Sequence, residues 1–329
     1  MKEIKAIDYS IWIGENSLSK LDISTYSKVA ILVDENTKRD CLFKLPQIEN
    51  ALIIEIKSGE EYKNISTCNF IWEQLTINNF DRNALLINLG GGVIGDMGGF
   101  CAANYKRGLE FIHIPTTLLS MVDASVGGKL GINFKGFKNQ IGLFNNPNSV
   151  LIYPKFLETL EESELKSGFA EVVKHALISD NSLWLKLKNT PFADLDWKDI
   201  IDTSVHIKNK IVLADPFEKG ERKKLNFGHT FGHAIESYYL ENGTPISHGE
   251  AIFMGMILET EISDLSEINK NEIKNYLLSN FALPYTPKKT YLHKFLLNDK
   301  KNQNEKINFT LLSGIGNCSI DNLFSINEL

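Results

Sequence analysis

The sequence has few cysteines, no long hydrophobic run and no excess of basic residues. Its cysteines are scattered with no C-x-x-C pair, which argues against a disulfide framework and against a cysteine metal site. No apolar run approaches the roughly 18 residues of a membrane span, and residues 1–5 lack the apolar core of a signal peptide. The formal charge of −6 offers no electrostatic footprint for nucleic acid. We therefore expect a cytoplasmic globular protein that binds neither nucleic acid nor a membrane.

The order of hydrophobic patterns predicts an α/β fold. Strand-like runs alternate with helical spacing in the first half, which is typical of a parallel sheet with crossover helices. Strand-like runs nearly vanish after Pro154, and helical spacing dominates. With 329 residues, the chain is long enough for two domains, and we expect an α/β domain over 1–153 and a mostly helical domain over 154–329. The expected strands are 29–34, 51–56, 84–89 and 109–114, and the expected helices are 64–80, 157–180, 196–214, 222–240 and 248–265.

A glycine cluster follows the expected strand 84–89. Gly90, Gly92 and Gly95 fit G-x-G-x-x-G, a spacing that permits a tight turn and lets backbone N–H groups approach a pyrophosphate. Alone the motif is weak, because glycines also allow close helix–sheet packing. At least two strands precede it, whereas the usual dinucleotide fingerprint follows the first strand of the fold. An ordinary Rossmann dehydrogenase is therefore not the natural interpretation.

A second segment favours anion binding. Pro115, Thr116 and Thr117 are typical of a helix start with hydroxyls near its free N–H groups. Further on, Lys129 and Lys138 lie in a glycine-rich stretch that also holds an asparagine. Surface lysines are usually only solvated, but this combination favours an anion site.

Histidines cluster in the helical half. His229 and His233 are four residues apart and would project from one helix face. A third, His248, begins the next expected helix, where Ser247 and Glu250 form a capping box.

Glu171 and His175 form a further pair four residues apart. A catalytic zinc needs about three ligands from His, Asp or Glu and one open position. Spacing leaves two assignments open: the His229/His233 pair with a carboxylate, or Glu171, His229 and His248 from three helices. The alternative to a metal is hydrogen-bonded core histidines, and their clustering beside glycines favours the metal.

Taken together, these motifs resemble the 3-dehydroquinate synthase family, which belongs to the sugar phosphate cyclases and acts in the shikimate pathway toward chorismate and the aromatic amino acids. Each motif is weak alone, but the ordered set covers nearly the whole chain and is highly specific. The matching stretches are 90–96, 105–108, 115–119 with 122–123, 127–129, 138–139, 167–174, 225–236, 248–250 and 299–301.

The resemblance implies a Rossmann-like NAD-binding α/β domain followed by a metal- and substrate-binding helical domain. It selects Glu171, His229 and His248 as ligands of one zinc or cobalt ion, and His233 as a neighbouring catalytic residue. The implied NAD contacts are Ser58, Gly59, Glu60, Glu61, Tyr62, Lys63, Gly92, Val93, Ile94, Gly95, Asp96, Thr116, Thr117, Lys129, Lys138, Phe156, Leu157, Glu158 and Thr159. Ser58 departs from the family, which often has aspartate there, and residues 214–218 replace a more acidic stretch.

The implied substrate is a keto-acid sugar phosphate, 3-deoxy-D-arabino-heptulosonate 7-phosphate, and the implied enzyme is an NAD- and metal-dependent carbon–oxygen lyase. Arg107 resembles an arginine that the family donates to a neighbouring subunit, which implies a homodimer. Expected contacts to substrate carboxylate, hydroxyls and phosphate are Asp123, Asn139, Lys174, Lys208, Arg222, Asn226 and one of Lys300 or Lys301, with Lys301 preferred. Lys129, near the point where cofactor meets substrate, is expected to help offset the substrate's negative charge.

Three competing functions differ in their products. Another cyclase, of the valiolone or inosose type, would act on a non-acidic sugar phosphate. A metal-dependent polyol dehydrogenase would release NADH. A non-catalytic binding protein is disfavoured because the metal and substrate motifs are intact.

Overall fold

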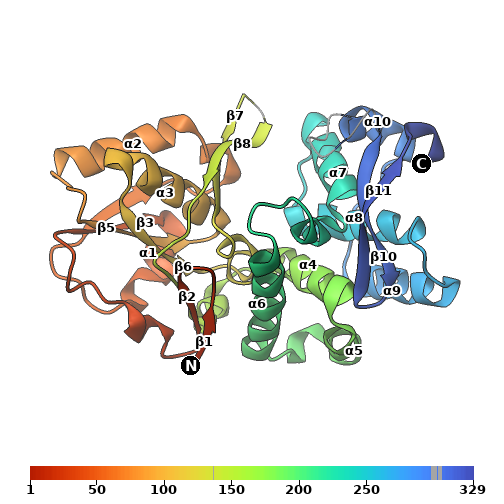
Figure 1. The fold of residues 1–329 in the computed structure, drawn as a ribbon, viewed down its shortest axis with the longest axis horizontal. Coiled ribbons are helices and arrows are strands. Elements are labelled where there is room, and N and C mark those ends of the chain that lie inside the picture. The colour runs from red at the N-terminus through yellow and green to blue at the C-terminus, as the bar shows by residue number, and fades with distance from the viewer. Residues whose placement is uncertain (136, 298–301, 303–305) are drawn as a thin grey trace. The chain divides into compact units, whose positions relative to one another are not determined.

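The computed structural model describes residues 1–135, 137–297, 302 and 306–329 (Figure 1). Contacts divide the chain into two compact units, one of residues 1–165 with 197–209 and the other of 166–196 with 210–329. These limits differ from the expected boundary at 153/154. The turn at Pro154–Thr159 and the start of the next helix remain with the first unit, and the chain later returns to it, where Asn209 Nδ2 donates to Lys5 O at 2.9 Å.

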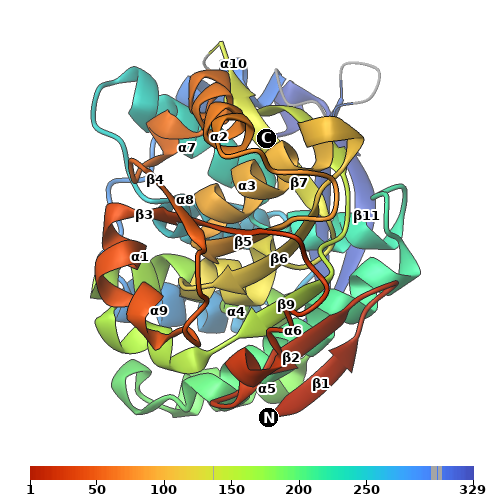
Figure 2. The ribbon, with the colours of Figure 1, turned by 90° about the vertical axis from the view of Figure 1, so that its left-hand side faces the viewer.

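The first unit is built on a mixed sheet with the order β1-β2-β9-β6-β5-β3-β4 (Figure 2). β1 is antiparallel to β2, and the other neighbours are parallel. All four expected strands and the first expected helix are confirmed. The elements are β1 Lys2–Lys5, β2 Ser10–Ile13, β3 Val29–Asp34, α1 Glu35–Asp40, β4 Leu52–Ile56, α2 Ile65–Ile77, β5 Leu85–Gly90, α3 Gly92–Asn104, β6 Glu110–Pro115, β7 Lys129–Phe134, β8 Phe137–Phe144 and β9 Ser149–Ile152.

Burial on both faces of the sheet explains why the sequences of these strands are continuous apolar runs. In β3, Ala30 and Leu32 face the same hydrophobic cluster as α2 and α3, while Ile31 and Val33 on the other face are also buried. A parallel strand buried on both faces loses the alternation of polar and apolar residues. The cluster includes Ala30, Leu32, Ile54, Ile56, Cys68, Ile71, Leu75, Leu86, Met97, Phe100, Cys101 and Phe111.

The strand order predicts a ligand site at the carboxyl ends of the strands. From β3 the chain crosses to β4 on one side, and β5 then pairs with β3 on the other side. Ligands of open α/β sheets bind at the carboxyl ends of the strands beside such a switch point. The loops after β4, β5 and β6 all begin at that end, so residues far apart in sequence converge there.

The second unit is mostly helical, as predicted, but it also contains a hairpin that the sequence did not predict. The hairpin strands bury Ile307, Phe309 and Leu311 in the cluster formed by α7, α8 and α10. The elements are α4 Glu162–Ser179, α5 Asn181–Asn189, α6 Trp197–Ala214 (continuing from the first unit), α7 His229–Glu241, α8 His248–Glu261, α9 Glu267–Asn280, α10 Lys289–Leu297, β10 Ile307–Gly314 and β11 Asn317–Phe324. Over the described residues, no helix has both the length and the apolar character needed to cross a membrane.

Candidate active site

The glycines after β5 serve either close packing or the lining of a cavity. A Cβ on Gly90 would lie 2.5 Å from Ile94 Cβ, and one on Gly98 would lie 2.0 Å from Asn88 Oδ1, so these two positions are closely packed. A Cβ on Gly92 or Gly95 would meet its first neighbours only at 3.5 and 3.7 Å. Gly92 and Gly95 are therefore less tightly packed, with neighbours only at ordinary contact distance, and they lie in the first turns of α3, where free N–H groups favour an anion.

A small cavity lies beside them, at the carboxyl ends of β5 and β6. Its lining residues are Asn88, Gly90, Gly91, Gly92, Gly95, Asp96, His113, Pro115, Ser120, Ala124 and Ser125. Asn88 and His113 face each other in register, with Asn88 Nδ2 3.4 Å from His113 Nδ1. Burial lowers the pKa of His113 to about 4, so the imidazole is neutral. Sequence reasoning missed both residues, although polar side chains inside two buried strands were a usable signal.

The loop after β4 meets α3 through Lys63. Its ammonium donates to Asp96 Oδ2 at 2.6 Å and to Asn139 Oδ1 at 2.7 Å, which brings together three predicted site residues. Burial lowers the pKa of Lys63, but the nearby carboxylates of Asp96 and Glu60 together raise it by more. The net shift of the pKa is therefore upward, and the ammonium stays charged. At the start of the same loop, Ser58 donates its hydroxyl and its N–H to Glu35 at 2.7 and 2.9 Å.

Asn133, which sequence reasoning missed, holds this loop against the β7–β8 hairpin. Its N–H donates to Lys63 O at 2.8 Å, and its side-chain amide donates to Glu60 Oε1 at 2.8 Å. Its side-chain oxygen accepts from the N–H of Asn139 at 2.9 Å. Asn133 therefore contacts the backbone of Lys63, the side chain of Glu60 and the backbone of Asn139, which are two predicted NAD contacts and one predicted substrate contact.

The segment after β6 forms a short helical turn. Thr116 N–H donates to Gly90 O at 3.0 Å, and Thr117 Oγ1 accepts from Ser120 N–H at 3.2 Å, so Thr117 caps the turn as predicted. Asp123, at the end of that turn, accepts from Lys208 Nζ at 2.6 Å. The pair joins two predicted substrate contacts within the first unit.

Other predicted residues lie on the surface of the first unit or in its core. Lys129, Lys138, Glu61, Glu158 and Thr159 are exposed, whereas Phe156 and Leu157 are buried and shape the turn that carries their neighbours. Arg107 is exposed in a turn where Lys106, Arg107 and Gly108 have φ values of 48°, 68° and 123°. Lys300 and Lys301 lie outside the described residues.

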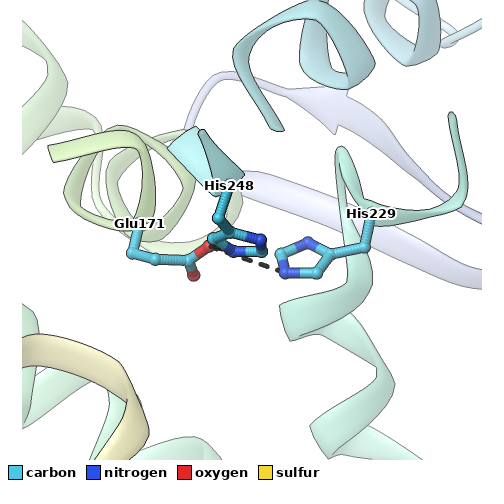
Figure 3. Close-up of side chains that lie close together, drawn as sticks. All are labelled: Glu171, His229 and His248. Atoms are coloured by element: carbon cyan, nitrogen blue, oxygen red, sulfur yellow. Dashed lines mark ion pairs between the residues drawn. The ribbon is translucent and has the colours of Figure 1, made fainter. Parts of the chain in front are cut away.

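Three helices of the second unit bring Glu171, His229 and His248 together (Figure 3). Glu171 Oε1 lies 3.5 Å from His229 Nε2 and 3.4 Å from His248 Nε2. Glu171 is 1% exposed and comes from α4, while His229 begins α7 and His248 begins α8. The predicted capping box is present, with Ser247 Oγ accepting from Glu250 N–H at 3.2 Å, so the first turn of α8 is held in place.

The tautomer of His229 suits a metal ligand. Its Nδ1 lies 3.1 Å from Phe227 O, and because a carbonyl only accepts, Nδ1 carries the proton and Nε2 presents its lone pair toward Glu171. Burial, followed by the positive charge of Lys174, lowers the pKa of His229 to about 3. The imidazole is therefore neutral, as metal ligation requires.

His233 lies beside the group but is not part of it. Its ring centroid is 5.3 Å from that of His229, one turn further along α7. The described geometry thus gathers one residue from each of three helices, rather than the pair on α7 with a carboxylate.

Three further residues predicted to contact substrate lie near the metal-ligand candidates in the sequence. Two of them, Lys174 and Arg222, are cationic and buried. Lys174 forms an ion pair with Glu171. Arg222 is 1% exposed and donates to Pro216 O at 2.6 Å, in a loop whose backbone N–H groups bind the Asp215 carboxylate. Asn226 Nδ2 donates to Glu218 Oε1 at 2.9 Å.

Comparisons with known proteins agree with the resemblance found in the sequence. Residues 53–167 match the family model "3-dehydroquinate synthase N-terminal", and residues 168–302 match "3-dehydroquinate synthase C-terminal". The chain is 41% identical to the 3-dehydroquinate synthase of Campylobacter concisus, over 97% of this chain and 93% of the relative.

Solved structures of other cyclases share the architecture. A 2-deoxy-scyllo-inosose synthase complexed with carbaglucose-6-phosphate, NAD⁺ and Co²⁺ superposes with a TM-score of 0.83 at 25% identity, covering 98% of this chain and 95% of that one. A 2-epi-5-epi-valiolone synthase from Streptomyces hygroscopicus with NAD⁺ and Zn²⁺ gives a TM-score of 0.85 at 24% identity, covering 100% and 96%, which shows the fold alone.

Proposed function

Because the chain belongs to the 3-dehydroquinate synthase family, we propose that it converts 3-deoxy-D-arabino-heptulosonate 7-phosphate to 3-dehydroquinate and phosphate. The observation that carries this proposal is the match of both family models in order, together with 41% identity over nearly the full length of a curated relative. The inosose and valiolone synthases share the fold at lower identity, 25% and 24%, which favours the acidic substrate over theirs.

NAD fits the first unit. The cavity-lining glycines of α3, the free N–H groups of its first turn and the Lys63–Asp96 pair lie at the carboxyl ends of the strands, where dinucleotides bind. A divalent zinc or cobalt ion fits the second unit, since Glu171, His229 and His248 offer a carboxylate and two imidazoles. When bound, NAD supplies a transient hydride acceptor and the metal a Lewis acid for the substrate hydroxyls, so phosphate can leave by β-elimination without net oxidation.

The chain's own residues supply binding and proton transfer. Arg222, Lys174 and Asn226 are assigned to the anionic groups of the substrate, where a buried guanidinium and ammonium offset phosphate and carboxylate charge. His233 is assigned to proton movement at the hydroxyl that is oxidised. Asp123 and Lys208 are assigned to substrate hydroxyls as an ion-paired unit.

A homodimer follows from the proposed role of Arg107. Two consecutive non-glycine residues, Lys106 and Arg107, have positive φ in this exposed turn, and residues strained in this way cluster at active sites and ligand-binding segments. We assign Arg107 to the substrate site of a neighbouring subunit, so each site would need both chains.

The deciding experiment is phosphate release from the heptulosonate phosphate with only catalytic amounts of NAD. We expect many phosphates per NAD and no accumulation of NADH. Stoichiometric NADH would instead indicate a polyol dehydrogenase. Glucose 6-phosphate serves as the control substrate, and faster turnover of it would indicate an inosose-type cyclase.

A further inference from the structure

The N-terminus of α7 is held by a carboxylate from α8. Glu259 is fully buried, and its Oε2 accepts from Gly228 N–H at 2.5 Å. Its Oε1 accepts from Thr230 N–H at 3.0 Å and from Phe231 N–H at 3.1 Å. Gly228 adopts φ +79° and has no side chain with which to cap the helix. Glu259 therefore satisfies N–H groups that the helix leaves free, at the end where its dipole favours negative charge.

One of these hydrogen bonds continues to the imidazole of His229. The N–H of Gly228 and the carbonyl of Phe227 belong to the same peptide group, and that carbonyl accepts from His229 Nδ1 at 3.1 Å. The chain of contacts runs from carboxylate to peptide to imidazole. A carboxylate bound to the peptide N–H polarises the group and makes its carbonyl a stronger acceptor. A stronger acceptor at Nδ1 both orients the ring and makes Nε2 a better ligand.

The same helix also fixes the other imidazole. α8 begins with His248 and carries Glu259 near its end. A Cβ on Gly255 would lie 2.0 Å from Gly228 O and 2.6 Å from Gly232 N, so the backbones of α7 and α8 touch. The register between the two helices is therefore set along their contact, with Glu259 at the end where α7 begins.

We propose that Glu259 is a positioning residue for the metal ligand His229 and acts through the Phe227–Gly228 peptide group. This inference rests on the metal-dependent function proposed above. Glu259→Gln is the informative variant, because an amide keeps the shape of the side chain but offers one acceptor oxygen in place of two. At least one of the N–H groups of Gly228, Thr230 and Phe231 then faces the side-chain NH₂ of the glutamine, which donates and cannot accept its hydrogen bond.

A matched control lies one turn further along the same chain segment. Ser263 is buried, donates to Glu259 O at 2.7 Å and accepts from Leu312 N–H at 3.0 Å. Ser263→Ala removes buried hydrogen bonds beside Glu259 without changing its carboxylate. It measures what a general loss of stability at this end of α8 does to metal binding.

The experiment measures zinc and cobalt binding to the metal-free full chain by competition with a chromophoric chelator, with the cobalt absorption spectrum and thermal unfolding in parallel. Glu259→Gln is expected to weaken metal binding by about 10- to 100-fold and to shift the cobalt spectrum. Ser263→Ala is expected to bind metal as the wild type does, even with a lower melting temperature. NAD affinity should be unchanged in both.

The outcomes separate this inference from the function beneath it. A wild-type chain that binds neither zinc nor cobalt overturns both the metal-dependent function and the role of Glu259. Tight wild-type binding with Glu259→Gln within twofold of it overturns only the role of Glu259, as does an equal loss in Ser263→Ala. If Glu259→Gln does not fold, Glu259→Asp, which keeps the charge but shortens the reach, replaces it, and metal affinity within twofold of wild type overturns the role.

Discussion

Lys63 Nζ lies 2.6 Å from Asp96 Oδ2, and this ion pair joins the loop after β4 to the N-terminal half of α3. The lysine is 4% exposed, so its charge depends on the carboxylate beside it. Both residues belong to segments predicted to contact NAD, and the pair fixes those segments relative to each other.

Replacing Lys63 with methionine should therefore damage both cofactor binding and stability. Removing one partner of a buried ion pair costs about 3–5 kcal/mol, because the other charge stays buried. We expect Lys63→Met to lower the unfolding free energy by about that amount and to weaken NAD binding by roughly tenfold or more. Calorimetry and NAD titration test this. Lys38→Met, which removes a surface ion pair with Glu55, is the control, and an NAD affinity equal to wild type in Lys63→Met would remove Lys63 from the cofactor site.

Gly95 and Gly98 should respond in opposite ways to alanine. At Gly95 a Cβ has its nearest neighbour at 3.7 Å, so Gly95→Ala should fold with equal or slightly higher stability, about 0.5–1 kcal/mol, from the better helix former. It should weaken NAD binding, because the methyl enters the cavity. At Gly98 a Cβ would lie 2.0 Å from Asn88 Oδ1, so Gly98→Ala should be strongly destabilised. Melting temperatures and NAD titration separate the two, and an unaffected NAD affinity in Gly95→Ala would contradict the proposed cofactor site.

The three candidate metal ligands predict which alanine variants lose bound metal and which keep it. Glu171→Ala, His229→Ala and His248→Ala should each lose bound metal after dialysis, since each removes one of only three ligands. His233→Ala should keep the metal and lose turnover. Metal content by mass spectrometry decides between them. Loss of metal in His233→Ala with retention in His248→Ala would favour the pair on α7 instead.

Shared sites predict complementation between inactive variants. Arg107→Ala and Glu171→Ala should each be inactive alone. After refolding together, half of the dimers are mixed, and each mixed dimer has one intact site, so about a quarter of wild-type activity should return. If Arg107 serves its own chain, every site keeps one lesion and activity stays at the level of the separate variants.

Burial of His113 predicts a loss of stability in acid. Burial lowers its pKa in the folded chain to about 4 from 6.5, so below pH 6.5 the unfolded chain binds a proton that the folded chain does not. The unfolding free energy should therefore fall as pH decreases from about 6.5 to about 4, by at most about 1.4 kcal/mol per pH unit from this residue. His113→Gln should flatten this dependence, measured by urea unfolding between pH 7 and 4. His206→Gln, which removes an exposed imidazole, is the control, and equal slopes in wild type and His113→Gln would contradict the assignment.

The sequence by itself determined the elements that local physics controls. The strands between residues 29 and 114 were readable because burial on both faces demands continuous apolar runs. The start of α8 was readable because Ser247 and Glu250 cap it locally. The resemblance identified the family because its motifs are ordered along the chain. The hairpin of β10 and β11 was missed, since its short alternating pattern makes sense only against the helices it covers.

Only the tertiary structure decided which distant groups meet. Spacing left the metal ligands open between two sets, because a distance of four residues is visible in sequence and a contact between α4, α7 and α8 is not. Asn133 and Glu259 carry no motif of their own in the sequence, and their roles depend on backbone groups that folding brings within 2.5–3.1 Å. Long-range hydrogen bonds of this kind are set by packing rather than by neighbours in the chain, so a sequence read alone does not reveal them.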